Sequence, residues 1–411
     1  MSSHTPKNAG PREFIWLIAS IMMIVAFAID SMLPALPQIG RSLGVPVENQ
    51  RQFVISAFLI GFGIAQIFIG TFSDRYGRRG IMLWSLIAYA VTSLMAALAP
   101  TFELLLLARA TQGVAAAGAR VMVTAAVRDR FEGREMARVM SFAHVIFMAA
   151  PILAPAMGQL VLEIAKWQWI FGVLALIGIL IWFWVLLRLP ETLEPNKRVE
   201  ISVHQLTISW MKVLRDRQSS GYTIAGTAMM AALMGFLLSV QQVFEVVLGR
   251  GDLLPIGFAI MAAGMAAASL VNGAIVVRYG MRLIGHAALM GFTLIAIIHV
   301  IVAVTGHETL YTFIGLQMLM MMCFSFAAGN FGAMALENLG SVAGTASSIQ
   351  GSFNSIFGTV LGTMIGQMFN GTTVPLYTGF AFFGMVALVV VFVTERGSFF
   401  VARHAPKPVE D

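Results

Sequence analysis

Long apolar stretches alternate with short polar segments along the whole chain of 411 residues. A helix needs roughly 20 predominantly apolar residues to cross the hydrocarbon core of a bilayer, and each stretch approaches that length. The pattern therefore predicts an all-α membrane protein with twelve transmembrane helices. The predicted spans lie at residues 14–37, 51–72, 80–99, 103–125, 138–163, 167–189, 221–246, 254–276, 282–305, 309–335, 342–369 and 374–396.

The longest polar segment runs from Pro190 to Ser220 and divides the predicted spans into six and six. A short repeat supports this division, because Gly, Arg, Tyr, Gly and Arg recur at an offset of 203 residues between the segments 70–79 and 273–282. We therefore predict an N-terminal six-helix bundle (1–190), a cytoplasmic linker (191–220) and a C-terminal six-helix bundle (221–411), with pseudo-symmetry between the bundles. Parallel repeats of this kind place a substrate between the halves, near the midplane of the membrane.

Composition and charge agree with a membrane protein. Hydrophobic residues make up 58% of the chain and charged residues 11%, whereas soluble domains carry about 25% charged residues. Of the 26 Lys and Arg residues, 20 fall in segments on one side of the predicted membrane, 4 on the other and 2 inside spans. This bias predicts that both termini are cytoplasmic. It also explains the net charge of +6 without a nucleic-acid partner.

Two ionisable residues inside predicted spans are the strongest candidates for function. Asp30 lies in the outer half of the first span and Arg109 near the outer end of the fourth, so both are expected at a similar depth. Charged groups in the membrane are costly and usually mark transport pathways. We expect Asp30 to exchange a proton, with Arg109 beside it or facing the same cavity. The alternative is an ion pair that only holds the two helices together.

Several classes of protein and site are excluded or disfavoured. No Gly precedes a Lys, so the chain lacks the phosphate-binding loop of ATP-driven pumps. His and Cys residues do not occur with metal-ligand spacing, and no catalytic constellation appears. We therefore expect no enzyme activity, no cofactor and no metal, and we expect the lipid bilayer, protons and a small-molecule substrate as partners of a monomer.

The chain resembles the major facilitator superfamily, and within it the Bcr/CflA drug-resistance transporters. Gly70 to Arg79 matches the family signature between the second and third helices. Further matching stretches are Asp30-Ser-Met-Leu-Pro34-Ala-Leu-Pro37, Arg109-Ala-Thr-Gln112-Gly113, Val127-Arg128-Asp129, Ala150-Pro151-Ile-Leu-Ala-Pro155-Ala-Met-Gly158, Leu189-Pro-Glu-Thr-Leu193 and Ala343-Gly344-Thr345-Ala346-Ser347-Ser348.

The resemblance implies two six-helix bundles in a bacterial inner membrane and proton-driven export of drugs or small metabolites. It assigns proton coupling to Asp30 and Arg109. The expected gating residues are Gly70, Asp74, Arg75, Gly77, Arg78, Arg79, Pro151 and Pro155. Candidates for the substrate cavity are Phe27, Gln66, Gln112, Gln241 and Asn354.

One residue of the signature is expected to act through a helix dipole. The eleventh span begins near Gly344, and its positive end is expected to attract Asp74. The second-half loop has Val277 in place of Asp74, so a latch of this kind is expected on one side only. The fifth span also departs from the antiporter pattern, because it reads Ala150-Pro151 and Gly158-Gln159 where Gly-Pro and Gly-Gly are usual.

The leading hypothesis is a proton-coupled exporter that works by alternating access. A second hypothesis is a metabolite importer or uniporter with the same fold. A third, from another class, is a membrane receptor that does not transport.

Overall fold

A computed structural model describes residues 10–131, 133–193, 203–340 and 343–400. The described residues form helices and no strands. The helices are α1 (Pro11–Asp30), η1 (Leu33–Ala35), α2 (Leu36–Ser42), η2 (Glu48–Gln52), α3 (Phe53–Tyr76), α4 (Arg78–Ala97), α5 (Phe102–Arg130), α6 (Gly133–Phe147), α7 (Ala150–Ile164), α8 (Gln168–Arg188), α9 (Val203–Arg215), α10 (Arg217–Gln242), η4 (Val243–Val247), η5 (Gly251–Leu253), α11 (Leu254–Tyr279), α12 (Met281–Val304), α13 (Leu310–Leu336), α14 (Ala343–Gln367) and α15 (Val374–Thr394).

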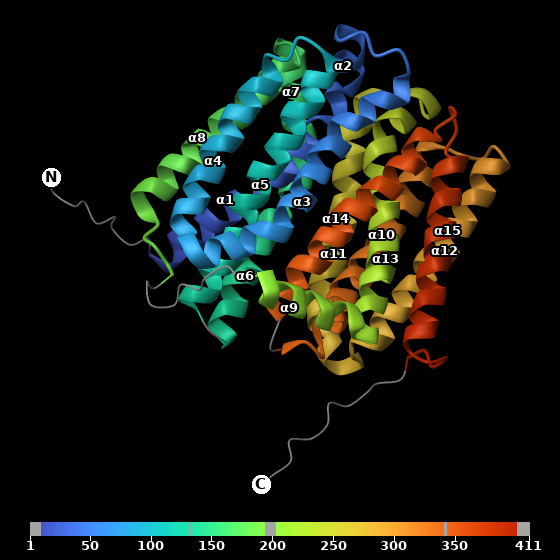
Figure 1. The fold of residues 1–411 in the computed structure, drawn as a ribbon. Helices are drawn as coiled ribbons and strands as arrows, with labels where there is room; N and C mark the ends of the chain where they lie inside the picture. The colour runs from blue at the N-terminus through green and yellow to red at the C-terminus, as the bar shows by residue number, and fades with distance from the viewer. Residues whose placement is uncertain (1–9, 132, 194–202, 341–342, 401–411) are drawn as a thin grey trace.

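The helices pack in two groups that follow the order of the chain. Helices α1 to α8 lie together on one side of the molecule and α10 to α15 on the other (Figure 1). The groups, here called the first and second halves, meet where α3 packs along α14 and where α7 packs along α11. We call the end where α3 meets α4 the inner end, and the opposite end, where α1 gives way to α2, the outer end.

Ten helical segments in the described part of the chain are long and apolar enough to cross a membrane. The helices α5 and α14 are equally long but more polar, and they pack along other long helices, α5 along α3 and α4 and α14 along α10 and α3. The prediction of an all-α membrane protein is confirmed. The predicted placement of the two termini concerns residues 1–9 and 401–411, which lie outside the described residues.

Two of the predicted spans are interrupted in the structure. The first was expected to be helical from 14 to 37, but α1 ends at Asp30 and the chain continues through a turn into η1 and α2. Pro34 and Pro37 explain the break, because proline lacks an amide hydrogen and disfavours helical geometry in the residue before it. The fifth span is likewise divided, since α6 ends at Phe147 and α7 begins with Ala150 and Pro151.

The predicted linker contains a helix that the sequence pattern did not reveal. In α9, Trp210 and Val213 pack against Leu339 and Ile349 at the inner end of the second half. Ile208 and Met211 are exposed, so this short helix is apolar on more than one face. In the structure α10 begins at Arg217, four residues before the predicted boundary of the second bundle.

Candidate functional site

The carboxyl group of Asp30 belongs to the last residue of α1, at the break described above. The residue is 6% exposed, and no ion pair between described residues involves it. The following residue, Ser31, lies against α7, because a Cβ atom added to Gly158 would come 2.2 Å from the Ser31 carbonyl oxygen. Asp30 is therefore placed where the broken first span meets the broken fifth span.

The guanidinium of Arg109, in α5, is fully buried and connects three helices. Its Nε donates to the carbonyl oxygen of Val54 in α3, and its Nη2 donates to that of Ala28 in α1, both at 2.9 Å. Aromatic rings also face it, with the guanidinium carbon 4.6 Å from the ring centre of Phe58 and 5.7 Å from that of Phe171. Carbonyl dipoles and π faces thus replace a carboxylate as its partners.

Asp30 and Arg109 form no ion pair with each other among the described residues, and the expected proximity of their charges stays a prediction. Arg109 is bonded to the carbonyl of Ala28, two residues before Asp30. The structure describes no ion pair between the two side chains, so it gives no support to the alternative in which such a pair holds the first and fourth spans together. Arg109 does hold those spans together, but through the backbone.

Gln112 supports Arg109 from one helical turn away. Its Oε1 accepts from Nη1 of Arg109 at 2.6 Å, and its Nε2 donates to Ser93 in α4 at 2.7 Å. The side chain is fully buried within the first half. Its expected role in lining the cavity stays a prediction, and the structure adds a role in orienting Arg109.

The other predicted cavity residues are distributed over both halves. Gln66 faces Gly351 across the contact between α3 and α14, and its buried Oε1 has no hydrogen-bond partner among the described residues. Asn354, in α14, accepts a hydrogen bond of 2.9 Å from Thr227. Gln241 donates to Glu245, and Phe27 is half-buried near the end of α1.

The segment Gly70 to Arg79 forms the predicted turn at the inner end. Gly77 has a φ of +94°, which L-amino acids with a side chain rarely adopt, and this allows α3 to end and α4 to start within one residue. The carboxylate of Asp74 pairs with Arg78 at 2.7 Å, and Arg78 also contacts Asp129 of α5 at 3.0 Å. Arg75 stacks on the ring of its neighbour Tyr76.

Glu191, which the sequence reasoning did not assign to the site, completes this arrangement. Its carboxylate accepts from the backbone amides of Arg78 and Arg79 at 2.9 and 3.3 Å. These amides are the first of α4, where the helix dipole favours a negative charge. The charged residues at the inner end therefore tie α3, α4, α5 and the segment after α8 into one unit.

The second half has its own charged cluster at the inner end, but Val277 stands where the first half has Asp74, and the expectation of an Asp74-type latch on one side only stays a prediction. Gly280 repeats the turn with a φ of +81°. Arg282, the counterpart of Arg79, is buried and pairs with Glu337 and Glu395, each at 3.0 Å. Val277, by contrast, is 91% exposed.

Asp74 was expected to be attracted to the start of α14 near Gly344. In the structure Asp74 forms an ion pair with Arg78, and the side chain beside Gly344 is that of Arg128.

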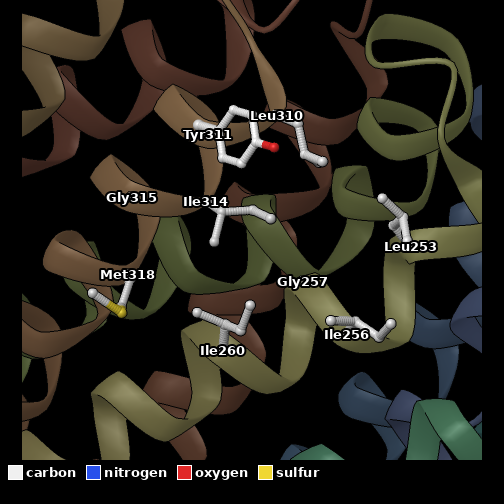
Figure 2. Close-up of a pocket in the computed structure, with 9 residues that line it drawn as sticks. All are labelled: Leu253, Ile256, Gly257, Ile260, Leu310, Tyr311, Ile314, Gly315 and Met318. Atoms are coloured by element: carbon white, nitrogen blue, oxygen red, sulfur yellow. The ribbon is translucent and has the colours of Figure 1, made fainter.

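An apolar groove lies at the outer end between α11 and α13 (Figure 2). It encloses about 330 Å³ and is lined by Leu253, Ile256, Gly257, Ile260, Leu310, Tyr311, Ile314, Gly315 and Met318. None of the predicted cavity residues is among them. Ile256 and Tyr311 are 60% and 85% exposed, so we interpret the groove as part of the surface that faces lipid.

Comparisons with known proteins match this chain to one protein family and to bacterial relatives. The family model described as Major Facilitator Superfamily matches residues 18–363. An uncharacterized MFS-type transporter, YdgK of Bacillus subtilis, is 30% identical over 355 residues, which cover 85% of this chain and 87% of the relative. A bicyclomycin resistance protein homolog of Haemophilus influenzae is 27% identical over 392 residues, covering 93% and 96% of the two chains. The multidrug resistance protein MdtL of Shewanella oneidensis is 33% identical over 181 residues, covering 44% and 46%.

Proposed function

Since this chain belongs to the Major Facilitator Superfamily, a family of membrane transporters, we propose that it exports drugs or small metabolites in exchange for protons. The cycle is alternating access, in which the two halves open a shared cavity to one side of the membrane at a time. The protein resides in a bacterial inner membrane, with its inner end and both termini in the cytoplasm. Drug export is supported by the names of two relatives, a bicyclomycin resistance protein homolog and a multidrug resistance protein.

The observation that carries the proton-coupling proposal is the position of Asp30. A buried carboxylate without a countercharge is costly, whereas the protonated acid is neutral and tolerated. Asp30 is buried at the end of α1, and Arg109 is bonded to backbone carbonyls. A proton and a cationic or polar substrate therefore compete for the same carboxyl group, and one leaves when the other binds.

Arg109 and Gly158 connect that event to helix movement. Arg109 fixes the α1 backbone at Ala28, just before Asp30. Gly158 packs against Ser31, just after it. A change in charge at Asp30 that shifts the end of α1 therefore also shifts α7. This helix follows the break in the fifth span and contacts α11 of the second half. Pro151 and Pro155 give this region the bend that the gating proposal requires.

The test is transport by Asp30→Asn in proteoliposomes with an imposed pH gradient. We expect the variant to insert and fold but to lose substrate movement driven by the gradient. Asp252→Asn is the matched control, because Asp252 lies at the outer end and is paired with Arg250, and it should transport normally. Gradient-driven transport that survives in Asp30→Asn would remove Asp30 from the mechanism.

The direction of movement distinguishes the export proposal from its alternative. In inside-out vesicles energised by respiration, an exporter accumulates substrate within the vesicle. A uniporter equilibrates the substrate irrespective of the gradient, and a proton-driven importer carries it in the opposite direction. Either result would contradict the proposal of export, but it would not change the assignment of the chain to the family.

A further inference from the structure

Neutral side chains join the two halves at the outer end. Gln52, at the end of η2, donates through Nε2 to Oε1 of Gln242 in α10 at 2.6 Å. Gln242 donates in turn to Oδ1 of Asn49 at 2.7 Å. Gln367, at the end of α14, donates to the backbone carbonyl of Asn49 at 2.7 Å and to Oε1 of Gln52 at 3.2 Å. We call Asn49, Gln52, Gln242 and Gln367 the amide cluster.

Two members of the amide cluster, Gln52 and Gln242, are buried, Asn49 and Gln367 are partly buried, and the side chains are well satisfied. Asn49 donates through Nδ2 to the backbone carbonyls of Gln367 and Phe369, both at 3.0 Å, and Gln52 also donates to that of Gly366 at 3.1 Å. Gln52 is fully buried and Gln242 is 1% exposed. Each side-chain oxygen and nitrogen of Asn49, Gln52 and Gln242 therefore has a partner, which makes the network rigid and specific.

The neighbouring contacts between α3 and α14 are closely fitted to this arrangement. A Cβ atom added to Gly366 would lie 2.2 Å from Oε1 of Gln52, so glycine is what lets the amide approach α14. One turn along each helix, the hydroxyl oxygens of Ser56 and Thr363 are 2.7 Å apart. The seam between the halves is thus polar and close from Asn49 to Ser56.

The amide cluster contains no group that titrates at physiological pH. Charged residues lie around it. Arg51 pairs with the exposed Glu48 at 3.7 Å, Glu245 bonds to Gln241 and attracts Arg51 across the halves, and Arg41 repels Arg51. The inner end is different, because Arg78 and Arg282 each contact two carboxylates there. The two ends of the molecule are therefore held by different chemistry.

We propose that the amide cluster is the outer gate of the transport cycle, and that its closure does not itself depend on pH. This rests on alternating access as proposed above. Amides exchange a protein partner for water at a small net cost, so the cluster separates when the halves rock apart and re-forms when they close. Removing one member leaves its partners unsatisfied only in the closed state, which shifts the protein toward the outward-open state.

A disulfide reporter measures the gate directly. Ser56→Cys and Thr363→Cys would place two sulfur atoms where oxygen atoms now lie 2.7 Å apart, close enough to bond when the gate is closed. The background is Cys323→Ala, since Cys323 is the one cysteine of the chain. Thr309→Cys with Thr312→Cys, whose hydroxyl oxygens are 3.1 Å apart within the second half, is the reference pair for thiol reactivity.

Two variants test the gate independently. Gln52→Leu removes the central amide, and Gly366→Ala inserts a methyl group against it. We expect each to slow oxidation of the reporter, relative to the reference pair, by at least about fivefold. Gly332→Ala, a helical glycine of α13 with open space at its Cβ position, should have no effect. A variant that keeps its thermal unfolding midpoint but oxidises the reporter at the unchanged rate overturns the proposal. If both variants lose the midpoint, Gln242→Glu takes their place, because it retains the size of the side chain and adds a charge. Unchanged oxidation in Gln242→Glu then overturns the proposal.

The dependence on pH separates this proposal from the proposed function. In an Asp30→Asn background we expect the normalised oxidation rate to be the same at pH 6 and pH 8, and a residual pH dependence overturns the neutral gate. With Asp30 present, a rate that varies with pH supports proton coupling through Asp30. A rate that is flat in both backgrounds supports the neutral gate and contradicts proton coupling.

Discussion

The guanidinium of Arg109 donates a hydrogen bond to the backbone carbonyl of Ala28 at 2.9 Å. This bond fixes the last turn of α1, which ends two residues later at Asp30. The bond ties a buried cation to the backbone just before a buried acid, and no ion pair between described residues joins the two side chains. In the proton-coupling proposal, this arrangement leaves the carboxyl group of Asp30 available to bind a proton or a substrate.

Arg109→Lys should abolish most transport and lower stability. A lysine ammonium lacks the planar fork that reaches Val54, Ala28 and Gln112 at once, so at least one buried carbonyl or amide loses its partner, at about 1–3 kcal/mol each. Thermal unfolding in detergent and transport in proteoliposomes measure the two effects. Arg120→Lys, at a site whose described bond is a 3.5 Å contact with Thr124, is the control; an equal loss there would contradict a special role for Arg109.

Gly158→Ala should impair transport through the contact between α7 and the end of α1. Its methyl group would lie 2.2 Å from the Ser31 carbonyl oxygen, and a backbone atom cannot rotate away. Overpacking of this kind typically costs about 1–3 kcal/mol. Gly172→Ala in α8 meets only an ordinary contact of 3.7 Å and should behave like the parent. Transport by Gly158→Ala at the wild-type rate would show that this contact is not part of the transport mechanism.

Arg282→Ala should destabilise the second half. It would remove the cation that contacts the buried carboxylate of Glu395 and its neighbour Glu337, and breaking a buried pair costs about 3–5 kcal/mol. Arg278→Ala, which removes an exposed arginine stacked on Tyr279, should change stability by less than about 0.5 kcal/mol. The free energies of unfolding of the two variants should differ clearly, and similar values would show that the Arg282 cluster adds little.

Glu308→Ala should loosen the outer end of the second half. Glu308 accepts from Thr373 at 2.6 Å and contacts Nε2 of the buried His299 at 3.1 Å, so its removal leaves both without that partner. We expect a loss of about 1–3 kcal/mol, read from thermal unfolding. Glu308→Gln keeps an acceptor oxygen and should recover part of the loss; a loss as large as that of Glu308→Ala would point to the charge as the important feature.

The sequence by itself determined that this protein lies in a lipid bilayer, and it determined much of the helical architecture. Apolar length decides that helices cross a bilayer, and the repeat of Gly77 at Gly280 marks equivalent turns, because both need a backbone conformation that favours glycine. Asp30 and Arg109 stood out because charge is costly in lipid. These are local properties of residues and spacing, so they can be seen without coordinates.

The tertiary structure decided which side chains are partners. Arg109 is bonded to backbone carbonyls rather than to Asp30, and sequence cannot rank a carbonyl of one helix against a carboxylate of another. Gln52 and Gln242 are 190 positions apart, and each is an ordinary amide when considered alone. Hydrogen bonds between helices depend on how each helix is rotated about its axis and on how far apart the helices lie. Packing sets both quantities only after the two halves have folded and come into contact.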